Sequence, residues 1–189
     1  MPNSIKRSFT SILFTSLSLL LCMPLPAVAD NTQSEIDKKV ELALKEFHKE
    51  VPNAKNYLKE AKGVLVIPDV KKVGFVIATQ WGTGALQENG RTVGYYKMEV
   101  GSIGLQAGYQ KADFVFIFFS QEALNEFREN EGWSAGAEAG LTLATVSTGM
   151  TTDSLKDKTA VAGFAFGKEG LMAGWSGKGT KFTRVELDK

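Results

Sequence analysis

From residue 64 onward the sequence pattern changes from helical to mainly strand-like, with apolar residues at every second position in several segments. Residues 73–81 and 102–109 alternate clearly, and the unbroken apolar run at 112–119 predicts a central strand that is buried on both faces. The chain has 19 glycines and 12 phenylalanines but only 5 prolines, a composition that suits a twisted sheet better than a helical bundle. The sequence therefore predicts a fold dominated by one sheet.

Turn signals divide the remainder of this region into further strands. Asn89-Gly90 is the strongest hairpin signal in the sequence, and it predicts that residues 73–81 are joined to a strand at 92–99. We expect about eight strands in all. The others are expected at residues 64–67, 134–145, 160–167, 171–176 and 181–187, with 160–167 and 171–176 forming a second hairpin.

Helical periodicity predicts two helices before the sheet. Residues 34–51 are amphipathic, and Ser34 and Asp37 have the spacing of a capping box at the start of this helix. Pro52 fits the first position of a second helix, over residues 53–62. The apolar stripe of the first helix consists of Ile36, Val40, Ala43, Leu44, Phe47 and Val51.

One further short helix is predicted between strands, over residues 121–130, where Ser120 can cap it. No linker or low-complexity stretch divides the chain into two domains. The predicted fold class is α+β, with N-terminal helices packed on a twisted antiparallel sheet, open or barrel-like, and one inserted short helix.

The first 29 residues predict a cleaved signal peptide. Lys6 and Arg7 form a basic start, residues 8–23 form an uncharged apolar run that is short for a membrane span, and Ala27-Val28-Ala29 has the pattern that signal peptidase recognises. Cleavage after Ala29 would leave a single domain at residues 30–189. We expect this domain to be periplasmic, associated with the cell envelope, or secreted.

A retained membrane anchor is the alternative. Its support is Cys22, which could carry a lipid, but a bacterial lipobox has a small residue before its cysteine and Leu21 is bulky. Cleavage would remove this cysteine, the only one in the chain, so the mature domain would rely on its hydrophobic core and not on disulfides.

Composition argues against several function classes. Lys and Arg number 22 and Asp and Glu number 21, so no large net charge indicates a nucleic-acid binder. One cysteine and one histidine cannot supply a usual zinc ligand set. Phosphate-loop and other cofactor fingerprints are absent from the sequence. We therefore expect no metal, no cofactor and no catalytic residue.

One motif resembles a catalytic element. Gly132-Trp133-Ser134-Ala135-Gly136 matches the G-x-S-x-G nucleophile elbow, which needs a strand before it and a helix after it. Here a helix-like segment comes before and a strand-like segment after, and the only histidine, His48, precedes the serine in the chain. A hydrolase that uses Ser134 is therefore disfavoured, and we expect Ser134 to be structural.

Charged residues are unevenly distributed along the chain. Residues 55–72 hold five lysines against Glu60 and Asp69, whereas residues 121–138 hold five glutamates against Arg128. A basic patch on a nearly neutral protein can bind an anionic ligand, and the alternative is that these lysines only solvate a helix face. The five lysines are Lys55, Lys59, Lys62, Lys71 and Lys72.

Several short motifs occur in a distinctive order: AKGV at 61–64, IP at 67–68, WGTGAL at 81–86, SIGLQAG at 102–108 and ADFVFI at 112–117. Together they resemble the SYLF domain, also called the Ysc84 actin-binding domain. The similarity is most specific at the last of these motifs. It continues through the strand from Ser134 and a hairpin at 170–177, and it covers about residues 34–186.

The resemblance implies a domain that binds phosphoinositides and other anionic phospholipids and has no accepted catalytic activity. Some eukaryotic members also bind actin. This chain has no SH3 or FYVE partner domain, and its signal peptide would place it away from actin filaments, so actin is not an expected partner. Ala78-Thr79 replaces a glycine pair of the family, and Glu138 adds a charge to the small-residue strand.

We therefore expect a non-enzymatic, exported lipid-binding domain whose partner is an anionic phospholipid surface. An exported bacterial protein would meet phosphatidylglycerol, cardiolipin or lipid A in place of phosphoinositides. The alternative is a soluble envelope module that binds protein and no lipid. The expected head-group site consists of Lys55, Lys59, Lys62, Lys71 and Lys72, with apolar insertion by Phe75, Trp81 or Trp133.

Overall fold

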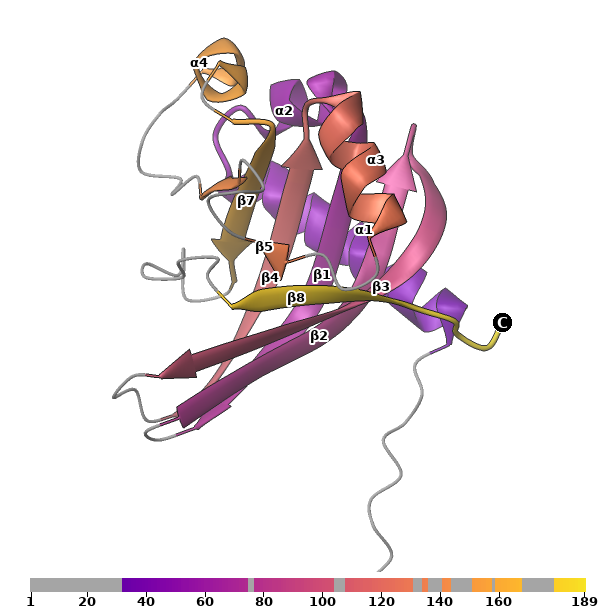
Figure 1. Ribbon diagram of the computed structural model, residues 1–189, viewed down its shortest axis with the longest axis vertical. Helices are drawn as coiled ribbons and strands as arrows, with labels where there is room; N and C mark the ends of the chain where they lie inside the picture. Colours follow the sequence, from indigo (N-terminus) through magenta and orange to yellow (C-terminus); the bar gives the residue numbers. More distant parts are fainter. Residues whose placement is uncertain are drawn as a thin grey trace, which may run out of the picture.

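The structure, a computed structural model, describes residues 32–74, 77–103, 108–130, 134–135, 141–143, 151–157, 159–167 and 179–189. They form helices and one mixed sheet, as Figure 1 shows. The helices are α1 (Gln33–Glu50), α2 (Ala54–Glu60), α3 (Gln121–Glu129) and α4 (Thr152–Lys156). The strands are β1 (Gly63–Gly74), β2 (Ile77–Glu88), β3 (Arg91–Ile103), β4 (Gly108–Phe118), β5 (Ser134–Ala135), β6 (Leu141–Leu143), β7 (Val161–Phe166) and β8 (Thr180–Val185).

The sheet has the strand order β5-β8-β3-β2-β1-β4-β7-β6. Six strands, from β8 to β7 in this order, are antiparallel to their neighbours, and the three-residue β6 is parallel to β7. β5 and β6 form the two ends of the order, so the sheet of the described residues is open and not a closed barrel. The predicted α+β class, with N-terminal helices on an antiparallel sheet, is confirmed.

Helix α1 packs across one face of the sheet, here called the outer face. Ile36, Val40, Ala43 and Phe47 are its buried residues, which confirms the predicted stripe at these positions. The Phe47 ring contacts the ring of Phe164 in β7 edge-on, at a centroid distance of 5.2 Å. Val66 of β1 and Val115 of β4 belong to the same cluster, so the middle of the sheet is covered on this side.

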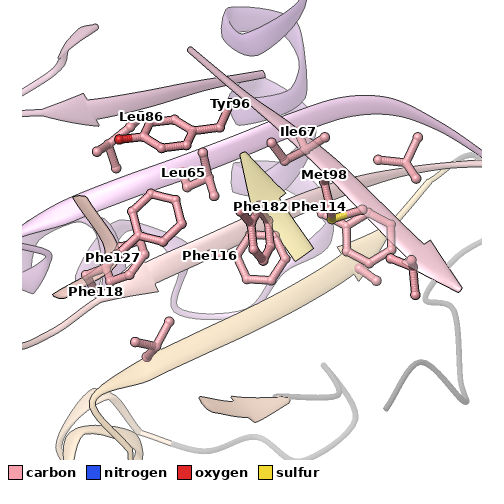
Figure 2. Packing of buried hydrophobic residues seen from close by; sticks show 14 of the residues in the cluster. Leu65, Ile67, Leu86, Tyr96, Met98, Phe114, Phe116, Phe118, Phe127 and Phe182 are labelled. Carbon is pink, nitrogen blue, oxygen red and sulfur yellow. The ribbon is translucent and has the colours of Figure 1, made fainter. Parts of the chain in front are cut away.

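The opposite face, the inner face, holds a second core that contains five phenylalanines (Figure 2). Phe182 of β8 lies 5.1 Å from Phe116 of β4 and 5.8 Å from Phe127 of α3, measured between ring centroids. Three strands separate β8 from β4 in the sheet order. Their side chains meet only because the sheet is strongly coiled around this core. Phe114, Phe116 and Phe118 face this core while Val115 and Ile117 face α1, so the central strand is buried on both sides as predicted.

The hairpin at Asn89-Gly90 is confirmed, but two predicted strands are wrong because the chain reverses within them. β1 ends at Gly74 and its antiparallel partner β2 begins at Ile77, inside the predicted strand 73–81. β3 likewise ends at Ile103 and β4 begins at Gly108, inside the predicted strand 102–109. The alternation of apolar residues continues across both reversals, so periodicity alone does not distinguish one strand from two.

The predicted strand at 134–145 is also corrected. Its described residues form β5, which pairs with β8, and β6, which pairs with β7. These two short strands lie at opposite ends of the sheet order. Helix α4 was not expected from the sequence, and the predicted strand at 171–176 lies outside the described residues.

The start of α1 differs from the predicted capping box. Thr32 is the N-cap, and its hydroxyl accepts a hydrogen bond from the backbone N–H of Glu35. Asp37 instead accepts hydrogen bonds from the hydroxyls of Thr92, at 2.9 Å, and Tyr95, at 3.1 Å, both in β3. Burial and this carboxylate raise the pKa of Tyr95. Asp37 therefore attaches the first turns of α1 to the sheet.

Candidate functional site

The structure separates the five predicted lysines into two groups. Lys55 and Lys59 are exposed on α2, and Lys62 is exposed just before β1 begins. Lys71 and Lys72 lie near the other end of β1, about 30 Å from Lys62 at the usual rise of a strand. β1 is also a central strand and not an edge of the sheet. The predicted lysines therefore do not form a single patch.

Lys71 has an aromatic neighbour that the predicted site also included. It lies directly opposite Trp81 in the β1–β2 ladder, and opposite Lys111 in the β1–β4 ladder. Residues that face each other in a ladder share one side of the sheet, and neighbouring strands are about 4.8 Å apart. Lys71 and Lys111 are exposed, and Trp81 is 38% exposed. We call Lys111, Lys71 and Trp81 the Lys-Trp row.

The Lys-Trp row lies on the outer face, beyond the region that α1 covers. Lys111 lies four residues before Val115 in β4, so both side chains are on the same face, and Val115 packs on α1. Ala112 and Val70 belong to the inner core. The row is therefore accessible from the side of α1. It places two ammonium groups beside an indole on three adjacent strands.

Two acidic residues lie beside the row, and one of them forms an ion pair with a lysine of the row. Lys111 Nζ lies 3.9 Å from Asp69 Oδ1, and Lys97 Nζ lies 2.9 Å from Glu99 Oε1. Glu99 is directly opposite Trp81 in the β2–β3 ladder. Among the ion pairs of the described residues, none includes Lys71. Lys71 is thus the cation of the row that is most available to an external anion.

A β-bulge positions the row. The register of β1 shifts between Ile67 and Val70, and Asp69 within it has a left-handed backbone with a φ of 53°. The backbone N–H of Asp69 donates a hydrogen bond of 2.8 Å to Asp113 Oδ1 in β4. Burial raises the pKa of Asp113, and the negative charges of Asp69 and Glu46 raise it further, against the effect of the hydrogen bond.

The other predicted site residues contribute little or lie outside the described part. Phe75 and Trp133 are outside the described residues, and for Lys72 only the backbone register is described, opposite Gln80 and Gln110. Sequence reasoning missed Lys111, because a lysine at the start of a buried strand gives no separate signal. Its place beside Lys71 depends on a pairing between strands that are distant in the sequence.

The group containing Lys55, Lys59 and Lys62 lies at the end of the sheet near α2 and α4. Glu60 on α2 accepts a hydrogen bond of 3.0 Å from Lys156 on α4, and this contact lowers the pKa of Glu60. Trp81 of the Lys-Trp row is exposed, whereas Tyr57, the aromatic residue of α2, is buried. These lysines therefore resemble a solvated helix face more than the Lys-Trp row does.

The surroundings of Ser134 do not match a nucleophile elbow. Helix α3 precedes Ser134, and Ser134 itself begins the short strand β5, opposite Lys181 of β8. This order is the reverse of the strand–turn–helix that thrusts a nucleophilic serine outward. His48 is exposed on α1. In the described part of the chain, no three His, Cys, Asp or Glu side chains gather as metal ligands would.

The Lys-Trp row therefore places two ammonium groups and an indole side by side on one accessible face of the sheet. Residues 99–186 match the family model described as Ysc84, Las17-binding protein actin regulator. This segment begins in β3 and ends just after β8, and over these residues the match confirms the resemblance to the SYLF family. The motifs at 61–64, 67–68 and 81–86 lie outside the matched segment. The SYLF domain is generally a binding module and not a known enzyme family. No curated protein gives a significant match to the chain.

Helices of the described residues are all too short or too polar to cross a lipid bilayer. The predicted signal peptide at residues 1–29 lies outside the described part, so its cleavage stays a prediction.

Proposed function

We propose that this protein is a non-enzymatic module that binds the surface of an anionic phospholipid membrane after export. The observation that carries the proposal is the position of Lys71 directly beside Trp81 on the accessible outer face. Lysine supplies charge for lipid phosphates, and tryptophan prefers the boundary between water and lipid. The resemblance to the SYLF domain supports the proposal because it implies phospholipid binding, and residues 99–186 match the Ysc84 family model.

The expected affinity is modest. A lysine close to an anionic membrane contributes about 1 kcal/mol, and salt at physiological concentration screens the attraction beyond about 8 Å. Two or three lysines alone give weak binding, particularly since Asp69 and Glu99 border the row. The indole of Trp81 therefore has to supply part of the binding energy by burying apolar surface in the interface.

Vesicle co-sedimentation tests the proposal. Measurement of the intact mass first establishes whether the N-terminal segment has been cleaved, and the protein is used in that form. We expect the wild type to bind phosphatidylglycerol vesicles and not phosphatidylcholine vesicles, and to bind more weakly in high salt. The double substitution Lys71→Ala/Trp81→Ala should weaken binding about tenfold, because it removes one charge contact and one interfacial aromatic.

The matched comparison is the triple substitution Lys55→Ala/Lys59→Ala/Lys62→Ala, which removes more charge from the α2 group and should weaken binding less. Equal sedimentation with the two lipids, or no sedimentation with either, would refute lipid binding and favour a protein-binding module. Full binding by a correctly folded Lys71→Ala/Trp81→Ala variant would place the site elsewhere.

A further inference from the structure

The four long strands β1 to β4 share one end that carries no charged residue. Neither residues 73–80 nor residues 100–110 contain a Lys, Arg, His, Asp or Glu. The ladders place the described parts of these segments together, because Gly74 lies opposite both Ala78 and Gly108, and Ala78 lies opposite Ser102. We call the described residues of this region, 73–74, 77–80, 100–103 and 108–110, the uncharged end.

The uncharged end extends beyond the rest of the sheet. β7 pairs with β4 only from Asp113 to Phe118, and β8 pairs with β3 only from Tyr95 to Val100. Figure 1 shows the four strands continuing past β7 and β8, away from α2 and α4. Among the residues that the structure describes, this end therefore projects beyond its neighbouring strands.

Cations stand immediately behind the uncharged end. Lys71 and Lys72 precede its part of β1, and Lys111 follows its part of β4. Glu99 on β3 lies at the same level, and Asp69 lies 3.9 Å from Lys111. Trp81 lies at the same level as Lys71 and Lys111, as part of the Lys-Trp row. The projection thus has an uncharged end with Lys71, Lys111 and the indole of Trp81 behind it.

The dimensions match a shallow insertion into a lipid surface. Gly74 comes three residues after Lys71 in β1, which corresponds to about 10 Å along a strand. Elements that lie in the membrane interface bury their apolar side to a depth of about 5–10 Å. When the uncharged end lies at the head-group and acyl boundary, the Lys-Trp row reaches the phosphates, where lysine and tryptophan are both favoured.

We propose that the uncharged end of β1–β4 inserts into the interfacial region of an anionic lipid bilayer, with the Lys-Trp row in contact with the phosphates. This inference rests on the proposed function and adds the orientation of the protein on the membrane. The insertion is shallow, because backbone groups at the sides of an open sheet need water or protein as hydrogen-bond partners and find neither in hydrocarbon.

Gly101 offers a direct test, because it lies in the uncharged end, is exposed, and a Cβ added there meets no atom of the described residues within 4 Å. Gly101→Asp and Gly101→Asn have nearly the same shape and differ in charge. We expect Gly101→Asp to bind phosphatidylglycerol vesicles about tenfold more weakly than Gly101→Asn, because its carboxylate would enter the anionic interface. Leu42→Asp, on the exposed side of α1, adds the same charge away from this end and should bind as the wild type does.

A fluorescent label gives an independent readout of orientation. In a Cys22→Ser background, an environment-sensitive dye at Gly101→Cys should shift to the blue on phosphatidylglycerol vesicles. The same dye at Val93→Cys, at the other end of β3 and 38% exposed, should not shift. If the wild type binds these vesicles but Gly101→Asp binds them as tightly as Gly101→Asn, the proposed orientation is wrong and the proposed function stands. The same holds if the emission of both dyes shifts alike. If the wild type does not bind, the proposed function itself fails.

Discussion

The extra residue that β1 carries near Asp69 decides which way Lys71 faces. Before the bulge, Val66 packs on the outer face and Ile67 on the inner face. A regular strand would continue this alternation and place residue 71 inside. Because the bulge adds one residue relative to β4, Val70 enters the inner core and Lys71 emerges on the accessible face. A single backbone irregularity therefore creates the candidate site.

Asp113 supports this bulge by accepting a hydrogen bond, but its negative charge is unfavourable because the carboxylate is partly buried. Burial raises the pKa of Asp113, so the folded state holds this proton more tightly than the unfolded state does. Its contribution to the free energy of unfolding is therefore greatest at low pH. That contribution falls as pH rises from the unfolded pKa through the raised folded pKa.

Asp113→Asn retains an oxygen that can accept the hydrogen bond from Asp69 and removes the charge. We expect this variant to be at least as stable as the wild type at pH 7 and to lose this part of the pH dependence. Asp113→Ala removes the acceptor and should cost about 1–2 kcal/mol. Urea unfolding at pH 4 and pH 7 measures both effects. If Asp113→Asn is as destabilising as Asp113→Ala at pH 7, the prediction is wrong and the carboxylate charge itself stabilises the bulge.

At the scale of elements, the contact between β1 and β2 depends on a glycine. A Cβ added at Gly84 would collide with the Val66 backbone oxygen and would lie 2.7 Å from Ile67 Cα. The neighbouring atoms are backbone and cannot rotate away, so the two strands would have to move apart next to the bulge.

We therefore expect Gly84→Ala to lower the free energy of unfolding by about 2–3 kcal/mol or more. Gly101→Ala, a glycine of β3 with open space around it, is the control and should change stability by less than about 0.5 kcal/mol. Urea denaturation compares the two variants. An unchanged midpoint for Gly84→Ala would mean that β1 and β2 are not this close.

The elements that the sequence predicted well are those with a strong local signal. Helix α1 follows from its apolar stripe, the central part of β4 from its unbroken apolar run, and the hairpin from Asn89-Gly90. Asn89 and Gly90 have φ angles of 50° and 74°, the positive values that a two-residue hairpin turn requires. The reversals between Gly74 and Ile77 and between Ile103 and Gly108 lack such a signal.

The candidate site was predictable only in part, because it depends on pairing between distant strands. Lys71 and Trp81 were both among the predicted residues, but nothing local to either shows that they are neighbours. Lys111 joins them only through the β1–β4 ladder. The bulge that turns Lys71 outward requires the side chain of Asp113, 44 residues further along the chain.

At the scale of the whole molecule, the two lysine groups mark opposite ends of the long strands. Lys55, Lys59 and Lys62 lie near α2, whereas the Lys-Trp row lies behind the uncharged end (Figure 1). Within the described part of the chain, only the second group combines cations with an exposed tryptophan and an uncharged projection. The account therefore predicts one orientation on a membrane, with α2 and α4 directed away from the lipid.

Hydrogen exchange measured by mass spectrometry, with and without phosphatidylglycerol vesicles, tests this central claim over the described parts of the chain at once. The predicted result is slower exchange in peptides from residues 71–81 and 99–111, no change in peptides from α2 and α4, and no effect of phosphatidylcholine vesicles. Slower exchange confined to α2 and α4, or unchanged exchange in all peptides at saturating phosphatidylglycerol, would contradict the account.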